Sequence, residues 1–180
     1  DESGVITTTF DEAMYFKNVE SGTFLSAGNY WGTSATLSAS EALDLTLEAV
    51  SKDVYNLKTN ISNGGTTNYM GSIATAGNAA YMDSEAANYT IKCLNDNYYN
   101  VSYTLSGTTY YLGYSSSTPA QVATNLTNGN ANAAKWELMT RDEMIAEMEQ
   151  AMANASESNP MDVTRYIYAP NFNRNDARNA

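Results

Sequence analysis

The sequence contains no histidine and a single cysteine, Cys93. These two absences exclude zinc sites built on histidine or cysteine, Ser-His-Asp triads, Cys-His dyads and any disulfide within the chain. Stability therefore has to come from packing. Because an unpaired cysteine usually behaves as a small apolar side chain, we expect Cys93 to fill a place in the core rather than to act as a nucleophile.

Basic residues are also scarce. Nine Lys and Arg stand against twenty Asp and Glu, which gives a formal net charge of −11, and the nine are scattered along the chain. Nucleic acids and anionic lipids are bound through clustered Lys and Arg, so this charge pattern excludes nucleic acid as a partner. The sequence also lacks any apolar run long enough for a transmembrane segment.

Motifs typical of catalysis are missing as well. The sequence has no glycine-rich loop of the kind that cradles phosphate. A glycosidase needs two carboxylates about 5 to 10 Å apart across a cleft, and the candidates Glu41, Asp44 and Glu48 surround one predicted strand, where we interpret them as surface charge. We therefore expect a protein that is not an enzyme and that uses no cofactor and no metal ion.

Apolar and aromatic residues, in contrast, are plentiful. The 180 residues are 43% hydrophobic and include 14 Tyr, enough for one domain with a sizeable core and a short appendage. The abundance of Asn, Ser, Thr, Tyr and Gly is typical of exported domains. The acidic start at Asp1 fits a chain whose signal peptide has been removed. We therefore expect an extracytoplasmic protein, either secreted or attached to the cell surface.

Three segments of the chain share one pattern. Each begins with an alternating strand, passes through a Gly-containing turn and reaches an aromatic-aliphatic-small triplet. A short third strand follows, at residues 35–37, 80–82 and 121–123, and then a strongly alternating fourth strand. Leu25, Met70 and Leu112 mark the triplets and Leu45, Tyr89 and Trp136 mark the fourth strands, and both sets recur every 42 to 47 residues.

Three units of four short strands predict an all-β protein with the β-trefoil fold, in which three hairpins cap a six-stranded barrel. The units cover about residues 15–53, 54–98 and 99–139, within a trefoil domain of residues 1–139. Another all-β sandwich or barrel with similar strand spacing is the alternative.

A C-terminal amphipathic helix is predicted after Leu138. Thr140 and Glu143 have the spacing of a capping box. The apolar face of the helix, which we expect to pack against the trefoil or a neighbour, consists of Met144, Ile145, Met148, Ala151 and Met152. Asn159-Pro160 ends the helix, and the polar tail that completes residues 140–180 predicts the entry into a further domain.

Two segments carry a resemblance to a known family. "YFKNVESGTFLSAGNYWGTSATLS" (15–38) and "AKWELMTRDEM" (134–144) resemble the first and last repeats of ricin-type β-trefoil lectin-like domains in secreted and surface proteins of gut bacteria. The resemblance covers roughly residues 15–143 and implies a trefoil and, by analogy, sugar binding. The Gln-x-Trp element of that family is matched only at Trp136, with Ala134 in place of Gln, and no unit carries the family's full set of sugar-binding residues.

The candidate carbohydrate-binding residues are Asn29, Tyr30 and Trp31, in the loop after the second strand of the first unit, together with Asp83. A sugar ring stacks its C–H face on an aromatic side chain while polar groups bind its hydroxyls. Two alternatives remain open: Trp31 folds back to fill the open end of the barrel or an interdomain contact, and Asp83 is a solvated turn residue or shares a calcium site with Asp96.

The sequence therefore predicts a non-catalytic, lectin-like module of a larger protein. Its expected partners are a glycan or polysaccharide and further domains of the same polypeptide. A structural or protein-interaction module that has lost sugar binding is the alternative, and the missing residues of the family's sugar site favour it.

Overall fold

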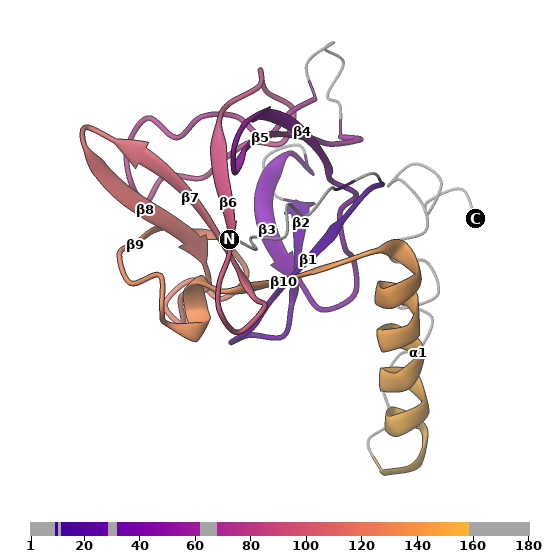
Figure 1. Cartoon of the computed structure of the whole chain (residues 1–180). Coiled ribbons are helices and arrows are strands. Elements are labelled where there is room, and N and C mark those ends of the chain that lie inside the picture. Colours follow the sequence, from indigo (N-terminus) through magenta and orange to yellow (C-terminus); the bar gives the residue numbers. More distant parts are fainter. Residues whose placement is uncertain (1–9, 11, 29–31, 62–67, 159–180) are drawn as a thin grey trace.

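The computed structural model describes residues 10, 12–28, 32–61 and 68–158, with side chains as far as residue 154. Within these residues the chain forms ten strands and one α-helix (Figure 1). The elements in chain order are β1 (Tyr15–Asn18), β2 (Phe24–Gly28), β3 (Ser34–Ser38), β4 (Thr46–Ser51), β5 (Val54–Lys58), β6 (Tyr89–Cys93), β7 (Tyr99–Leu105), β8 (Thr108–Gly113), β9 (Ala123–Leu126), the 3-10 turn η2 (Asn132–Ala134), β10 (Trp136–Met139) and α1 (Arg141–Ser158).

Six of the strands close into a barrel. Antiparallel pairing runs from β1 to β10, then through β7, β6 and β5 to β4. The ring is completed beside β1 and β4, where the backbone of Met14 and Leu45 exchanges two hydrogen bonds of 2.8 and 3.1 Å. Each first strand of a unit therefore pairs with the fourth strand of the unit before it, which leaves little exposed sheet edge.

The remaining strands form a cap of three hairpins. β2 pairs with β3 and β8 pairs with β9, and in the middle unit Tyr69 and Ser84 take the same place through two backbone hydrogen bonds of 2.9 Å. The hairpins also bind one another, since the Ala35 amide donates to the Ala80 carbonyl at 2.9 Å. This arrangement of three hairpins on a six-stranded barrel is the β-trefoil, and the predicted fold class is confirmed.

The cap departs from the predicted strands in two places. Residues 69–71 and 80–82 form only isolated bridges, Lys58 to Tyr69, Tyr69 to Ser84 and Ser34 to Tyr81. The last third strand, predicted at residues 121–123, is β9 and begins at Ala123. The middle hairpin is rich in Gly, Ala, Ser and Asn, which favour strands weakly, so its pairing depends on contacts with the other hairpins.

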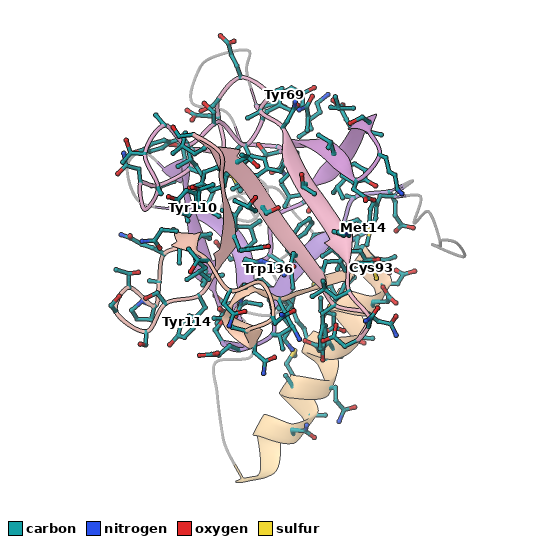
Figure 2. All side chains as sticks on the ribbon, turned by 60° about the vertical axis from the view of Figure 1, so that its left-hand side comes forward. Met14, Tyr69, Cys93, Tyr110, Tyr114 and Trp136 are labelled. Atoms are coloured by element: carbon teal, nitrogen blue, oxygen red, sulfur yellow. The ribbon has the colours of Figure 1, made fainter. Side chains whose placement is uncertain are left out.

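The core is built on the triplet and fourth-strand residues that recur at a regular interval in the sequence. Leu25, Met70, Leu112, Leu45, Tyr89 and Trp136 are each at most 2% exposed. Two of them also fix the cap to the barrel: Trp136 Nε1 donates to the Leu112 carbonyl at 2.9 Å, and the Tyr89 hydroxyl donates to the Gly71 carbonyl at 2.6 Å. Figure 2 shows Trp136 inside the barrel, beneath the strands.

The expected burial of Cys93 is wrong. Its thiol is exposed, although Tyr89 and Ile91 on the same face of β6 are buried. Cys93 is the last residue of β6 and pairs with Tyr99, the first residue of β7, so the strand has already passed the end of the core. Ala49 on β4 is exposed for the same reason.

The predicted C-terminal helix is α1, and it begins with the predicted capping box. The Thr140 amide donates to Glu143 Oε1 at 2.8 Å, and the Glu143 amide donates to Thr140 Oγ1 at 3.2 Å. Met144 and Met148 are buried in a second apolar cluster with residues of the barrel and the cap, which are Tyr15, Phe24, Ala42 and Met139. The helix then extends away from the barrel (Figure 1).

Among the described residues, α1 is too polar to qualify as a bilayer-spanning helix, and no other helix reaches the required length.

Candidate binding site

Three of the four predicted site residues lie outside the described residues. These are Asn29, Tyr30 and Trp31, between Gly28 at the end of β2 and Gly32. Gly32 has φ of 82°, a value that favours glycine over other residues and that directs the chain back into β3. The predicted sugar contact at this loop stays a prediction.

Asp83, the fourth predicted residue, lies on a segment adjacent to one end of that loop. The Met82 amide donates to the Thr33 carbonyl at 2.7 Å, and Tyr81 bridges Ser34. Asp83 is half-buried, and Tyr81 on the same segment is 40% exposed. The topology therefore brings residues 81–83 of the middle unit beside residues 32–34 of the first unit, a neighbourhood that spacing alone did not predict.

Asp96, considered as a calcium partner of Asp83, has a different role. Its Oδ2 accepts from Lys135 Nζ at 2.6 Å. This hydrogen bond, followed by one from the Tyr98 amide, holds the pKa of Asp96 below its usual range. In the described ranges, no three carboxylate, cysteine or histidine side chains come close enough together to hold a metal ion.

A pocket of about 350 Å³ opens where the second and third units meet. It lies beside the start of β6 and the end of β7, next to the segment that follows the middle triplet. Its lining consists of Ser72, Ile73, Ala74, Ala87, Asn88, Tyr89, Tyr103, Thr104 and Leu105. Its volume is near the lower end of the roughly 300 to 1,000 Å³ that small-molecule sites occupy.

Tyrosine rings form the inner wall of this pocket. Tyr103 meets Tyr89 edge to face, with ring centroids 6.3 Å apart, and is tilted by 32° against Tyr110 at 5.7 Å. The hydroxyls are held by the backbone, because Tyr89 donates to Gly71 and Tyr103 donates to the Thr124 carbonyl at 2.5 Å. Burial, followed by the neighbouring Tyr103, raises the pKa of the Tyr89 hydroxyl. Both rings are therefore fixed in place and neutral.

The outer edge of the pocket is polar and uncharged. Ser72, Asn88 and Thr104 are exposed, and among the nine described lining residues none is Asp, Glu, Lys or Arg. Asn88 Oδ1 accepts from Asn56 Nδ2 at 3.0 Å, which holds the Asn88 amide at the edge of the pocket. The lining therefore combines an apolar inner wall with uncharged hydrogen-bonding groups at the opening.

Sequence reasoning did not predict this pocket. Of the neighbouring tyrosine pairs Tyr98-Tyr99 and Tyr110-Tyr111, all four residues are half-buried, and Tyr99 and Tyr110 pack against the core. The residue that could have indicated the pocket is Tyr103. It lies opposite Tyr89 in the β6–β7 pairing, because the neighbouring residues Thr90 and Ser102 pair with each other. A large aromatic at that place differs from its counterparts in the other units.

The carboxylates considered for glycosidase chemistry have structural contacts. Asp44 accepts a hydrogen bond from the Tyr15 hydroxyl near Arg141, and burial raises the pKa of Asp44. Asp44 is therefore half-buried and hydrogen-bonded, and its interpretation as a solvated surface charge is wrong. Glu48 Oε1 accepts from the Tyr69 hydroxyl at 2.8 Å.

The comparisons with known proteins support the fold. No protein-family model matches the chain, and no curated protein matches it. Among solved structures, the chain is similar to a designed protein with threefold symmetry, ThreeFoil, with a TM-score of 0.53 and 16% identity over 72% of this chain and 99% of that chain. A likeness at this identity concerns the fold alone, so the ligand has to be argued from the pocket.

Proposed function

We propose that this chain is a non-catalytic glycan-binding module of a larger extracytoplasmic protein. The observation that carries the proposal is the uncharged pocket at the boundary of the second and third units, with its wall of fixed tyrosine rings. Carbohydrates bind to such surfaces because their C–H faces pack on aromatic rings while their hydroxyls exchange hydrogen bonds with amides and hydroxyls.

The net charge of −11 supports the same class of ligand. A negative field lowers the local concentration of anions, so polyanionic partners such as nucleic acid, sulfated glycans and anionic membranes are disfavoured relative to neutral glycans.

The test is binding of the whole chain to arrayed plant, host and microbial glycans, followed by affinity electrophoresis on neutral polysaccharides. We expect binding to a subset of neutral glycans. Trp31→Ala tests whether the loop after β2 contributes, and Asp83→Asn tests the neighbouring segment with little change of shape. Absence of binding to every glycan by the wild-type chain contradicts the proposal.

A docking module is the second candidate, and α1 is the observation that favours it. Met144 and Met148 are buried, whereas Ala151 and Met152 on the same face are only half-buried. Beyond its first turns the helix leaves the barrel (Figure 1). A neighbouring domain of the same polypeptide that packs on this part of the helix would cover the remaining apolar face.

This candidate predicts a difference between the chain alone and the full-length polypeptide. In hydrogen exchange, the amides of residues 149–154 should be more protected in the full-length polypeptide than in the chain alone. Equal protection in both contradicts a docking role for this part of α1.

A further inference from the structure

We propose that the pocket between the second and third units holds one neutral sugar residue, and that it is the one such site among the three unit boundaries within the described residues. This inference rests on the proposed glycan-binding function and adds its location, stoichiometry and ligand class. It depends on the way in which the threefold repeat is broken at this boundary.

The first break is the residue opposite the fourth-strand marker. Trp136 pairs with Asn18, and the neighbouring pairs Thr46–Lys58 and Thr90–Ser102 place Thr59 opposite Leu45 and Tyr103 opposite Tyr89. These equivalent residues are all polar and nearly buried. Each donates to a backbone carbonyl: Asn18 Nδ2 to Ala133 at 2.9 Å, Thr59 Oγ1 to Met82 at 2.8 Å and the Tyr103 hydroxyl to Thr124 at 2.5 Å.

The three side chains differ in size. Asn18 and Thr59 reach their carbonyl partners with short side chains, whereas Tyr103 reaches the Thr124 carbonyl with an aromatic ring, and that ring lines the pocket. Of the three, Asn18 alone bonds across a unit boundary, since Thr59 and Tyr103 each bond within their own unit. The residue opposite the fourth-strand marker therefore supplies an aromatic wall at this boundary and a short polar side chain at the other two.

The second break lies two residues before the fourth-strand marker. Leu43 in the first unit and Ala134 in the third are 6% and 0% exposed. Their counterpart Ala87 is half-buried and lines the pocket. Ala87 has the same side chain as the fully buried Ala134, so the break lies in what surrounds it: at this boundary the space beside Ala87 and Tyr103 is left open as the pocket.

The chemistry of the lining selects the ligand class. Ile73, Ala74, Ala87 and Leu105 offer an apolar surface, and Ser72, Asn88 and Thr104 offer hydroxyls and an amide at the opening. This combination fits one pyranose ring at the end of a glycan, with its C–H face inward and its hydroxyls at the opening. A carboxylate or sulfate on the ring would meet no cation among the lining residues and would lose solvation on entry.

The experiment uses the whole chain and defined sugars as probes. Methyl β-D-glucopyranoside, methyl β-D-galactopyranoside and N-acetylglucosamine represent neutral rings, and glucuronic acid and N-acetylneuraminic acid represent anionic ones. Titration by calorimetry and by amide NMR is expected to give one site per chain for a neutral ring. Shifts should centre on residues 72–74, 87–89 and 103–105, and the anionic rings should bind at least about tenfold more weakly.

Two matched substitutions locate the site. Ala74→Trp fills the pocket from an exposed position and should weaken binding of the neutral ring by about tenfold or more, whereas Ala39→Trp places the same side chain at an exposed turn of the first unit and should change affinity less than about twofold. Unfolding midpoints of both variants confirm that each one folds.

The outcomes separate this inference from the function on which it rests. Binding that Ala74→Trp leaves intact, but that Trp31→Ala abolishes, overturns the pocket while the glycan-binding function stands. Two or three equivalent sites per chain, or a preference for the anionic rings, also overturn it. Failure of every arrayed glycan and every free sugar to bind overturns both.

Discussion

Tyr89 and Trp136 occupy equivalent places in two units and make the same kind of hydrogen bond. Each sends a donor from the barrel core to a carbonyl of the triplet in its own unit, Gly71 for Tyr89 and Leu112 for Trp136. The first unit has Leu45 at this place, so it contributes packing there without a side-chain donor. The residue at this repeated position therefore fills the core in all three units, and in two of them it also donates a hydrogen bond to the cap.

We predict that Tyr89→Phe lowers the free energy of unfolding by about 1 to 2 kcal/mol, because the buried Gly71 carbonyl loses its donor while the ring volume is kept. Urea denaturation followed by circular dichroism measures the change. An unaltered midpoint would show that another donor replaces the hydroxyl.

Gly113 predicts a second effect at the scale of single residues. A Cβ there would lie 1.9 Å from the Ala133 carbonyl oxygen and 2.7 Å from Leu126 Cδ1, so Gly113→Ala requires the backbone to move. We expect a loss of about 3 kcal/mol or more, at the upper end of the cost of overpacking a core. Gly28→Ala is the matched control, since its nearest contact is Thr36 Cγ2 at 3.4 Å and it should fold almost as stably as the wild type. Equal thermal midpoints for the two variants would contradict this difference.

The packing of α1 against the barrel depends on local contacts that substitution can test. Thr140→Ala removes one half of the capping box and should destabilise the helix by about 1 kcal/mol, whereas Thr140→Ser keeps the hydroxyl and most of the stability. Amide exchange in the first turn of α1 measures the effect. Similar exchange in the two variants would mean that tertiary contacts alone hold the helix start.

The contact between β10 and α1 also predicts a dependence on pH. Partial loss of water around Glu137, followed by repulsion from Glu147, raises the pKa of Glu137 above its ordinary value of 4.5, although Lys17 counteracts this. The charged form is therefore disfavoured in the folded state, and the penalty present at neutral pH disappears as the pH falls through the raised pKa. Glu137→Gln should stabilise the protein at pH 7 by no more than about 0.5 kcal/mol, because the side chain is partly solvated.

Urea unfolding of Glu137→Gln and wild type at several pH values between 7 and 4 checks this expectation. The two should converge on acidification. A stability difference that widens as the pH falls would contradict a raised pKa of Glu137 in the folded state.

At the scale of elements, the sequence predicted those strands and helices whose apolar residues recur with a regular period. The first and fourth strands of every unit alternate, so their positions and the burial of Leu45, Tyr89 and Trp136 followed from the pattern. The capping box predicted the start of α1, and the apolar face predicted the burial of Met144 and Met148, whereas Ala151 and Met152 on that face are only half-buried. The middle cap hairpin was located only by spacing, because its bridges depend on neighbouring hairpins rather than on its own residues.

What the sequence could not supply depends on contacts between units. The exposure of Cys93 depends on where the barrel ends, which alternation along β6 does not encode. The pocket depends on Tyr103, Ala87 and Ile73, which come from three separated segments and form a surface only after the units meet. The loop with Tyr30 and Trp31, chosen for its aromatic residues, still awaits its binding test.

For the whole molecule, we expect self-repulsion among the carboxylates to govern the effect of salt on stability. With a net charge of −11, added NaCl should raise the unfolding midpoint, because screening reduces repulsion among carboxylates that the compact state brings together. Binding of a neutral sugar should change little over the same range of salt. Thermal melts and titrations at about 0.02 and 0.5 M NaCl compare the two at screening lengths that differ roughly fivefold. A midpoint that falls with salt would mean that attractive ion pairs, such as Lys135 with Asp96, outweigh the repulsion.

Cys93 gives the molecule a single point of chemical attachment. It is the only cysteine in the chain, and its thiol is exposed at the end of β6, about 13 Å along the strand from Tyr89 at the pocket. Figure 2 likewise separates Cys93 from Tyr110, whose ring packs on the pocket wall. A maleimide dye or biotin would therefore join each molecule at one known atom and leave the pocket facing solution. Oriented in this way on a surface, every copy would present the pocket to solution, and the same thiol would allow several copies to be joined into a multivalent reagent.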